Sequence, residues 1–326
     1  MYDKIPNVLT AQQILDRAFK KTKKIQITDR NALYKKKKTI IARIDSFSTT
    51  IVFNLEKYVK KFPSIDNLHP FYQELIDIRI DINILKKSLG AVDWARKTIQ
   101  SIYSKQSKFL KKSRNLDFLI QKQQEIYGRI SSIINQIKKE LNFLAEAQKI
   151  MNKFPDIQEI PTIVIAGYPN VGKSSILTCL SKAKPKIAVY PFTTKEIHVG
   201  HLERTVKNIK ERFQIIDTPG LLDRPFSERN IIEKQAISAL NTLADIIVFV
   251  IDPSETCGYS LEEQKNLFEN LKVLFNRSIF IVVENKSDLK MKSLNYLKIS
   301  SKTREGIDKL KEKIFTNYSL LDKNNE

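Results

Sequence analysis

Apolar positions in the first half of the chain recur with the spacing of amphipathic helices. One stripe has alternating steps of three and four residues and consists of Leu75, Ile78, Ile82, Leu85 and Leu89. This spacing places the stripe on one face of a helix. A second stripe consists of Ile126, Ile130, Ile133, Ile137, Leu141 and Leu144, and no glycine or proline interrupts residues 129–152. Long stripes joined by short turns predict an all-α helical bundle.

Prolines mark the ends of these helical segments. Pro63 and Pro70 predict a turn between two helices, in which Asp66 and Asn67 are candidate cap or turn residues. A later segment, residues 153–161, holds two prolines and ends the helical pattern. The sequence thus predicts a helical bundle domain, an α/β domain and a short tail, over residues 1–158, 159–320 and 321–326.

Beyond this boundary the apolar residues form short β-branched runs instead of long stripes. The predicted strands are Thr162–Ala166, Phe213–Ile216, Asp245–Ile251, Ile279–Val283 and Tyr296–Ile299. The predicted helices between and after them are Ser174–Ser181, Arg229–Leu243, Leu261–Phe275 and Gly306–Tyr318. Buried strands that alternate with helices predict an α/β fold with a mostly parallel sheet and helices on both faces. Such folds bind ligands in the loops at the carboxyl ends of their strands.

Composition narrows the class of protein. The 326 residues, 42% hydrophobic and 28% charged, are typical of a globular protein with roughly two domains. Its two cysteines are too few for a disulfide framework or a thiolate zinc site, which favours a reducing cytoplasm. The longest candidate core strand, Ile246–Ile251, is much shorter than the roughly 20 apolar residues of a membrane helix. The N-terminus lacks a secretory signal pattern. We therefore expect a soluble cytoplasmic protein with no membrane partner.

The net charge of the bundle indicates which kind of partner it binds. The chain carries 56 Lys and Arg against 36 Asp and Glu, a net charge of +20. Residues 1–160 hold 31 basic and 16 acidic side chains, so this half contributes +15 of the +20. A strongly basic surface attracts polyanions, and counterion release favours phosphate backbones. The charge favours a nucleic acid as partner, with an anionic membrane surface or a solvated lysine-rich face as the alternatives.

The loop after the first predicted strand has the residues of a phosphate-binding loop. Residues 167–174 read Gly-Tyr-Pro-Asn-Val-Gly-Lys-Ser, the G-x-x-x-x-G-K-[ST] pattern between a strand and a helix. The glycines let the backbone curl, so that its N–H groups and the helix N-terminus face the phosphates. Lys173 is expected to reach the outer phosphates and Ser174 to bind Mg²⁺.

A second motif predicts which base is bound. Asn285-Lys-Ser-Asp288 follows the strand Ile279–Val283, where base-recognition loops lie. A carboxylate at Asp288 can accept from N1–H and from the exocyclic amine of guanine, whereas adenine offers neither donor in that arrangement. Asn285 is expected to brace the loop and Lys286 to lie along the base plane. Ser300, Ser301 and Lys302 follow the next strand and are candidate backbone donors to the guanine oxygen, with a simple serine-rich turn as the alternative.

Two further loops are candidates for sensing the last phosphate. Asp217-Thr-Pro-Gly220 follows the strand Phe213–Ile216, so Asp217 can hold Mg²⁺ through water and the Gly220 N–H can meet the γ-phosphate. Pro191-Phe-Thr-Thr194 lies between the phosphate loop and this strand. Thr194 is the chosen candidate for completing the Mg²⁺ shell, with Thr193 as the alternative. His198 and His201 are interpreted as strand or surface residues and not as metal ligands.

The expected nucleotide contacts therefore come from several separate motifs. They are Gly167, Tyr168, Pro169, Asn170, Val171, Gly172, Lys173, Ser174, Ser175, Asp217, Thr218, Pro219, Gly220, Asn285, Lys286, Asp288, Ser300, Ser301 and Lys302. The candidate residues for hydrolysis are Lys173, Thr194, Gly220 and Asn170. The expected cofactors are GTP or GDP with Mg²⁺, and K⁺ is a further candidate.

With these residues in view, the chain resembles the nucleolar GTP-binding protein 1 family, within the wider Obg–HflX group of GTPases. The resembling segments are residues 62–72, 167–175, 190–195, 199–201, 217–225, 228–237 and 257–264. The resemblance implies a P-loop GTPase domain behind a helical domain. It also implies a role in assembly of the large ribosomal subunit, through contact with its rRNA. The length resembles that of archaeal members, which lack a long basic C-terminal extension, so a nucleolar location is not expected.

The resemblance leaves the catalytic water unassigned. Many small GTPases have a glutamine directly after Gly220 that orients this water. The chain has Leu221 there, as in hydrophobic-substituted GTPases, so slow intrinsic turnover is expected. Asn170 matches a residue that helps to bind K⁺ in some related GTPases, and a loop-shaping role for Asn170 is equally open. An activator in trans, the assembling ribosomal subunit, is the other candidate.

Three kinds of function are compatible with these features. The first is a GTP-dependent switch in large-subunit assembly that binds the pre-ribosomal subunit and its rRNA. The second is an RNA-binding scaffold whose nucleotide site turns over negligibly. The third is a translation- or stress-linked GTPase that acts on mature ribosomes.

Overall fold

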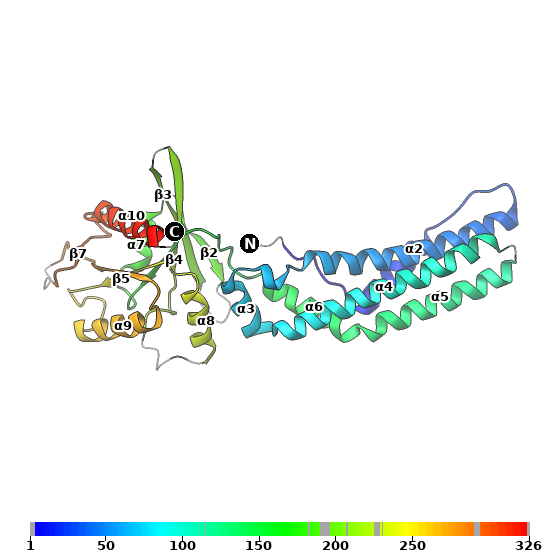
Figure 1. The fold of residues 1–326 in the computed structure, drawn as a ribbon, viewed down its shortest axis with the longest axis horizontal. Coiled ribbons are helices and arrows are strands. Elements are labelled where there is room, and N and C mark those ends of the chain that lie inside the picture. Colours follow the sequence, from blue (N-terminus) through cyan, green and yellow to red (C-terminus); the bar gives the residue numbers. More distant parts are fainter. Residues whose placement is uncertain are drawn as a thin grey trace. The chain divides into compact units, whose positions relative to one another are not determined.

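The helical stripes of the first half fold into a bundle (Figure 1). The computed structural model describes residues 4–113, 115–181, 183–189, 196–206, 208–224, 229, 231–289 and 294–324. The chain divides into two compact units, and the first comprises residues 2–67 and 79–152. Its helices are α1 (Ala11–Lys23), α2 (Ala32–Lys61), the 3₁₀ helix η1 (Ile65–Asn67), α4 (Ile82–Lys112), α5 (Leu116–Gln136) and α6 (Lys138–Met151).

Polar caps and apolar packing explain why these segments are helical. The Thr10 hydroxyl accepts from the backbone N–H of Gln13, whose side chain accepts from the N–H of Thr10, a capping box that starts α1. Helices α1, α2 and α5 meet around Phe19, Phe47 and Tyr127, whose ring centroids lie 4.4–5.5 Å apart. Phe47 is fully buried, so this aromatic cluster belongs to the core of the bundle.

The first predicted stripe does not lie on one helix, and this prediction was wrong. Asp81 interrupts it with a left-handed φ of 66°. The Asp81 carboxylate accepts from two backbone N–H groups of the next turn and is the N-cap of α4. The helix before it is α3 (Pro70–Ile80), whose residues 70–78 belong to the second compact unit. The second stripe is also split, because α5 ends at Gln136 and α6 begins at Lys138, with the non-helical Ile137 between them.

The second compact unit contains a seven-stranded sheet with the order β2-β3-β4-β1-β5-β6-β7. Its strands are β1 (Thr162–Ala166), β2 (Lys186–Val189), β3 (Glu196–Val206), β4 (Ile209–Asp217), β5 (Ile246–Ile251), β6 (Ile279–Glu284) and β7 (Leu297–Lys298). Strands β4, β1, β5, β6 and β7 are parallel to one another, whereas β3 is antiparallel to both β2 and β4. The predicted α/β fold with a mostly parallel sheet, preceded by an all-α bundle, is confirmed.

The sequence interpretation missed the hairpin of β2 and β3. The side chains of Ile197, Val199 and Leu202 on β3 are buried, while His198 and His201 are partly exposed. Ile197 and Val199 lie on one face of β3 and Leu202 on the other, so the buried residues of β3 do not form one continuous apolar run. Continuous apolar runs are typical of strands that are buried on both faces, and β3 has no such run.

Helices cover the sheet on both faces (Figure 1). They are α7 (Lys173–Leu180), α8 (Ile231–Asn241), α9 (Leu261–Leu274) and α10 (Ile307–Asn324), and α3 belongs to the same unit. Helices α7 and α10 contact each other, and α9 packs against β5. The hydroxyl of Tyr72 on α3 donates to the carbonyl oxygen of Pro155, at 2.8 Å, and accepts from the N–H of Ile157, at 2.9 Å. These bonds join α3 to the segment that leads into β1.

The change from one compact unit to the other falls between Asn152 and Lys153, and residues 68–78 belong to the second unit. The predicted domain boundary at residue 158 stays a prediction, as does the short tail over residues 321–326. In the described part of the chain, no helix is long and apolar enough to cross a bilayer. Cys179 and Cys257 are both free thiols.

Candidate nucleotide-binding site

Gly167 and Gly172 let the loop after β1 curl over the start of α7. Gly167 has a φ of 141°, and a Cβ atom there would lie 2.5 Å from the carbonyl oxygen of Val250. Gly172 has a φ of 100°, and a Cβ atom there would lie 2.2 Å from Nδ2 of Asn285. A larger residue at either position would displace backbone or a buried side chain. The loop over residues 167–174, called the P-loop below, depends on both glycines for its shape.

Lys173 lies inside this loop and is 8% exposed. Its Nζ atom donates to the carbonyl oxygens of Gly167, at 2.8 Å, and Tyr168, at 2.7 Å. Lys173 is also the first residue of α7, whose N-terminus carries a partial positive charge. The ammonium group and the helix N-terminus together form a surface that suits an anion.

Ser174 and Asp217 meet at the end of β4. The Ser174 hydroxyl donates to Oδ2 of Asp217 at 2.5 Å. Asp217 is fully buried, and its Oδ1 atom has no hydrogen-bond partner among the described residues. A buried carboxylate oxygen normally has a partner, so this atom is suited to a ligand or its water shell. Hard oxygen donors of this kind fit Mg²⁺, which is held by few protein groups and keeps several waters.

Thr193 and Thr194, the candidates for the remaining Mg²⁺ contact, lie outside the described residues. His198 pairs with Asp217 in the β3–β4 ladder, and its Nδ1 atom lies 3.6 Å from Oδ2 of Asp217. Among the residues with described positions, no three His, Cys, Asp or Glu side chains cluster as metal ligands. His198 and His201 both lie on β3. Their position agrees with the interpretation of both as strand or surface residues.

Asn285 joins the base motif to the P-loop. Its Nδ2 atom donates to the carbonyl oxygen of Val171 at 2.7 Å, and its Oδ1 atom accepts from the N–H of Ser301 at 3.0 Å. The side chain is 1% exposed. These contacts tie together the loops after β1, β6 and β7.

Asp288 is held as an ionised acceptor. The Ser300 hydroxyl donates to its Oδ1 atom at 2.6 Å, and this hydrogen bond is the main reason that the pKa of Asp288 lies below its usual value. The backbone of the Ser300 loop differs from the expectation. The N–H of Ser300 donates to the carbonyl oxygen of Glu305, and the N–H of Ser301 donates to Asn285. Two of the three proposed amide donors to the base are thus bonded within the protein, which leaves the amide of Lys302 for that role.

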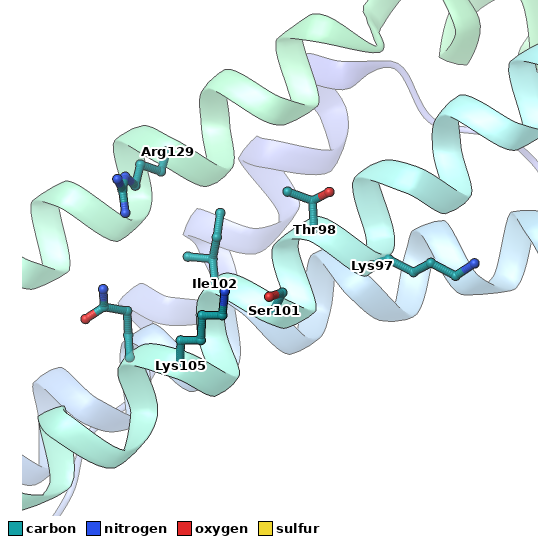
Figure 2. Close-up of a pocket in the computed structure, with 7 residues that line it drawn as sticks. Lys97, Thr98, Ser101, Ile102, Lys105 and Arg129 are labelled. Atoms are coloured by element: carbon teal, nitrogen blue, oxygen red, sulfur yellow. The ribbon is translucent and has the colours of Figure 1, made fainter.

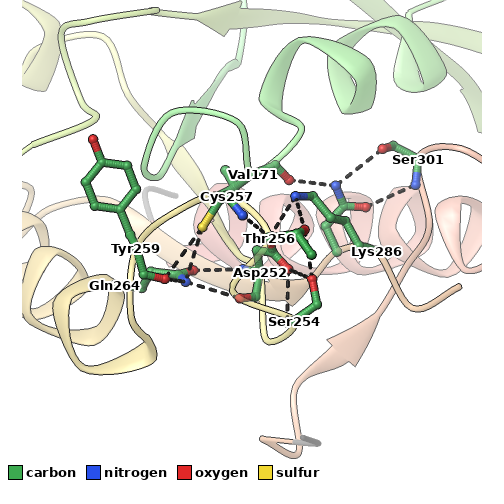
Figure 3. A network of polar contacts seen from close by, with 10 residues as sticks. Val171, Asp252, Ser254, Thr256, Cys257, Tyr259, Gln264, Lys286 and Ser301 are labelled. Carbon is green, nitrogen blue, oxygen red and sulfur yellow. Dashed lines mark hydrogen bonds and ion pairs between the residues drawn. The ribbon is translucent and has the colours of Figure 1, made fainter. Parts of the chain in front are cut away.

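Lys286 has contacts that the sequence interpretation did not include. Its Nζ atom donates to Oδ2 of Asp252 at 2.7 Å and to Oγ1 of Thr256 at 2.7 Å (Figure 3). Asp252 directly follows β5, the strand beside β6. The position of Asp252 in the sequence could have indicated this contact. A charged residue that directly follows a buried central strand lies at the same sheet edge as the phosphate and base loops.

The loop after Asp217 is fastened by an arginine. Leu221 is 1% exposed, and its carbonyl oxygen accepts from the guanidinium of Arg229, which is 5% exposed. Gly220 has a φ of 77°, and the Thr218 hydroxyl has no hydrogen-bond partner in the described residues. Asn170, the candidate K⁺ ligand, is exposed in the P-loop with a left-handed φ of 61°.

The remaining predicted contacts lie around the same loops. Tyr168 is nearly buried, and Pro169 is half-buried beside it. Ser175 is exposed in the first turn of α7, Pro219 is half-buried next to Gly220, and the side chain of Lys302 is exposed. The described members of the predicted set therefore gather at one edge of the sheet.

Comparison with known proteins assigns the chain to a family. The model of the NOG1 N-terminal helical domain matches residues 2–158, and the model of nucleolar GTP-binding protein 1 matches residues 231–288. An uncharacterized protein of Methanocaldococcus jannaschii is 38% identical over 292 residues, which are 88% of this chain and 81% of that protein. Nucleolar GTP-binding protein 1 of Saccharomyces cerevisiae is 34% identical over 296 residues, which are 87% of this chain. The chain belongs to the nucleolar GTP-binding protein 1 family.

The chain spans less than half the length of several curated relatives that it matches. It spans 44% of the yeast protein and 44% of its Drosophila melanogaster counterpart, which is 35% identical. A crystal structure assigned to nucleolar GTP-binding protein 1 of Plasmodium falciparum covers 53% of this chain at 33% identity, with a TM-score of 0.43. The second family model includes Asp252 and the base motif, whereas the P-loop lies between the segments that the two models match.

Proposed function

We propose that the chain binds GTP and GDP with Mg²⁺ and hydrolyses GTP. The observation that carries the proposal is the position of Asn285, which contacts Val171 of the P-loop and Ser301 at once. One buried amide keeps the phosphate-binding and base-binding loops at a fixed spacing, as a single bound nucleotide requires. The names of the relatives, which call those proteins GTP-binding, support guanine as the base.

Asp288 supplies the proposed base selectivity. The Ser300 hydroxyl occupies its Oδ1 atom and favours the ionised carboxylate. Guanine presents two donors on one edge, N1–H and the exocyclic amine, and a carboxylate accepts from both. Adenine has an acceptor at N1, so it would place a lone pair against the carboxylate. A site built to bind such donors rejects a base without them strongly, because its charged acceptor is then left unpaired.

The P-loop and Asp217 supply the proposed phosphate contacts. Lys173 and the P-loop amides hold the outer phosphates, and the Gly220 amide meets the γ-phosphate. Ser174 and Asp217 would hold Mg²⁺, Asp217 through water, with Thr194 as the proposed third residue. Mg²⁺ bound there would neutralise charge on the β- and γ-phosphates. The remaining P-loop contacts follow from the curl that Gly167 and Gly172 permit.

Hydrolysis is proposed to be slow in the isolated protein. The buried side chain of Leu221 has no group that can orient water, so another group must do so. Asn170 is exposed in the P-loop and is available to coordinate K⁺. The positive charge of K⁺ would offset the negative charge that develops when the γ-phosphoryl group is transferred to water. Contact with the assembling ribosomal subunit is the proposed second source of activation.

The proposed biological role is that of a switch in large ribosomal subunit assembly. The nucleolar names of the relatives and the basic bundle support this role. With GTP bound, the loop after Gly220 would be ordered and the bundle would stay on rRNA. Loss of the γ-phosphate would release the loop and then the subunit. A cytoplasmic location is part of the same proposal.

A basic groove in the bundle supports rRNA as the partner. Lys97, Lys105 and Arg129 line a groove between α4 and α5, together with the hydroxyls of Thr98 and Ser101. Figure 2 shows Arg129 of α5 facing the α4 side of this groove. Cationic and hydroxyl groups are the usual protein contacts to phosphate oxygens. The groove thus has the chemistry of a backbone-contacting surface.

Two measurements test the proposal. Calorimetry with GTP, GDP and ATP should give tight binding of both guanine nucleotides and none of ATP, and equal binding of ATP would contradict it. Sedimentation of cell extracts should place the protein with immature large subunits. Migration with polysomes would instead favour action on mature ribosomes. Single-turnover hydrolysis with and without large subunits separates a switch from a scaffold that does not turn over.

A further inference from the structure

The segment from Asp252 to Tyr259, called the brace below, folds around one buried carboxylate. Asp252 is fully buried. Its Oδ1 atom accepts from the backbone N–H of Ser254 at 3.0 Å and from the Ser254 hydroxyl. Its Oδ2 atom accepts from the Thr256 hydroxyl at 3.0 Å, the Cys257 N–H at 2.9 Å and the Lys286 ammonium at 2.7 Å. Both oxygens are therefore fully used, and most of the donors come from the brace itself.

Charge explains why a carboxylate occupies this position. Burial acts to raise the pKa of Asp252, but the hydrogen bonds from Lys286, Ser254 and Thr256 and the charge of Lys286 outweigh it, so the pKa lies below its usual value. The group is ionised at neutral pH. A buried carboxylate needs such compensation, and the Lys286 ammonium is its charged partner.

Lys286 is held at both ends of its side chain. Its backbone has a left-handed φ of 63°, which costs a non-glycine residue energy and persists only when the surroundings impose it. Its Nζ atom is held by Asp252 and by the Thr256 hydroxyl. A lysine stem with both ends fixed loses little further entropy when a flat ligand packs on it. The stem is thus set before the nucleotide arrives.

Gln264 on α9 bonds to the residues at both ends of the brace. Its Oε1 atom accepts from the N–H of Asp252 at 2.8 Å, and its Nε2 atom donates to the carbonyl oxygens of Asp252 and Tyr259 (Figure 3). The ring of Tyr259 stacks on the ring of Tyr168 in the P-loop, with centroids 4.1 Å apart and planes at 29°. The brace therefore contacts the base motif through Lys286 and the P-loop through Tyr168.

We propose that Asp252 is a positioning residue for the guanine nucleotide, and that it acts by holding Lys286 against the base plane. Thr256 supports the same ammonium group, and Tyr259 keeps the brace in register with the P-loop. The inference rests on the proposed function, since it concerns how the site binds guanine. It assigns a role in nucleotide binding to Asp252 and Thr256, which are not among the contacts predicted from the sequence.

A double-mutant cycle on the full chain tests this role. The variants are Asp252→Asn, which keeps the size of the side chain, Lys286→Met, which keeps an apolar stem, and the double variant. Calorimetric titration with GDP gives the affinity of each. Asp252→Asn should weaken GDP roughly tenfold in the wild-type background, the size of effect expected when a charged hydrogen bond is lost. In the Lys286→Met background, Asp252→Asn should change the affinity for GDP by less than about twofold, because the effects of substitutions at contacting residues are not additive.

Gln264→Leu is the matched control, because it loosens the brace without touching Lys286. If Asp252 only stabilised the fold, both Asp252→Asn and Gln264→Leu would weaken GDP in proportion to their loss of thermal stability. Both substitutions would also weaken GDP binding when they are made in the Lys286→Met background. Either that result, or unchanged GDP affinity of Asp252→Asn, would overturn the inference. Failure of the wild-type chain to bind GDP is a separate outcome that would overturn the proposed function itself.

Thr256→Val gives a second test that keeps the Asp252 carboxylate itself in place. It removes one acceptor of the Lys286 ammonium and one donor to Asp252. GDP affinity should fall by a smaller factor than in Asp252→Asn and, again, only while Lys286 is present. An effect of equal size in the Lys286→Met background would count against positioning through Lys286.

Discussion

Glu74 on α3 accepts a hydrogen bond from the Ser238 hydroxyl on α8. Helix α3 lies within the segment matched by the N-terminal helical domain of the family, whereas α8 follows the loop that begins at Asp217. Both helices belong to the second compact unit. The bond therefore links a helix of the N-terminal family domain to a helix of the unit that contains the sheet.

The Glu74 carboxyl gives this contact a pH dependence. Burial raises the pKa of Glu74 above its usual 4.5, and the bond from Ser238 offsets only part of that effect. The folded state thus binds the proton more tightly than the unfolded chain, so the contribution to stability is full below pH 4.5 and is lost as the pH rises through the folded-state pKa. Glu74→Gln should keep the bond and remove the charge.

Scanning calorimetry of the full chain checks this expectation. At pH 7 the Glu74→Gln variant should unfold a few degrees above the wild type, on the order of 1–4 °C. Near pH 4 the two midpoints should coincide, because the wild-type carboxyl is then protonated. A variant that unfolds below the wild type at pH 7 would contradict a raised pKa at this position.

Base preference should change with Asp288→Asn. An amide can donate to the second carbonyl of xanthine but cannot accept from two guanine donors, so GTP affinity should fall by roughly 10–100-fold while xanthosine triphosphate binds better. Competition titration against a fluorescent nucleotide measures both. Ser300→Ala is the control, since it removes a partner of Asp288 and should weaken GTP without favouring xanthine. Unchanged GTP affinity of Asp288→Asn would refute the role of Asp288.

Turnover should depend on the monovalent cation. At matched ionic strength, GTP hydrolysis should be roughly three- to tenfold faster in K⁺ than in Na⁺, a change in barrier of about 0.6–1.4 kcal/mol. Asn170→Ala should remove this difference between the two salts. Equal rates of the wild type in the two salts would remove K⁺ from the mechanism and leave the ribosomal subunit as the activator.

RNA binding should weaken steeply with salt, because phosphate contacts release counterions. Replacing Lys97 and Lys105 in the groove of the bundle by serine should reduce the slope of log affinity against log salt by roughly 1–2. The same change at Lys309 and Lys313, which are exposed on α10, is the control for net charge. Filter binding of large-subunit rRNA by the full chain measures both slopes. A salt-independent affinity would indicate a protein partner instead.

Central strands and nucleotide motifs were predictable because burial and backbone curvature restrict their residues. The predicted strand Thr162–Ala166 has the bounds of β1, since a strand buried on both faces reads as one apolar run. Gly167 and Gly172 likewise allow no side chain in the folded loop. These features depend on local sequence and could be read along the chain.

Other features depend on contacts that sequence spacing does not encode. The apolar stripe from Leu75 to Leu89 kept its period across Asp81, so only the cap residue distinguishes two helices from one. The pairing of Asp252 with Lys286 joins residues 34 positions apart through the packing of two strands. Thr194, whose role rests on its place between motifs, lies outside the described residues and stays a prediction.

The placement of α3 has a practical consequence for anyone who shortens this protein. Phe71, Leu75 and Ile76 are fully buried, yet the backbone that carries them leaves the bundle after Asn67 and returns to it at Arg79. A fragment that starts at residue 159 would lack this helix and expose the apolar surface beneath it. Such a fragment should aggregate or require detergent, whereas co-expression with a peptide of residues 68–80 should restore its solubility.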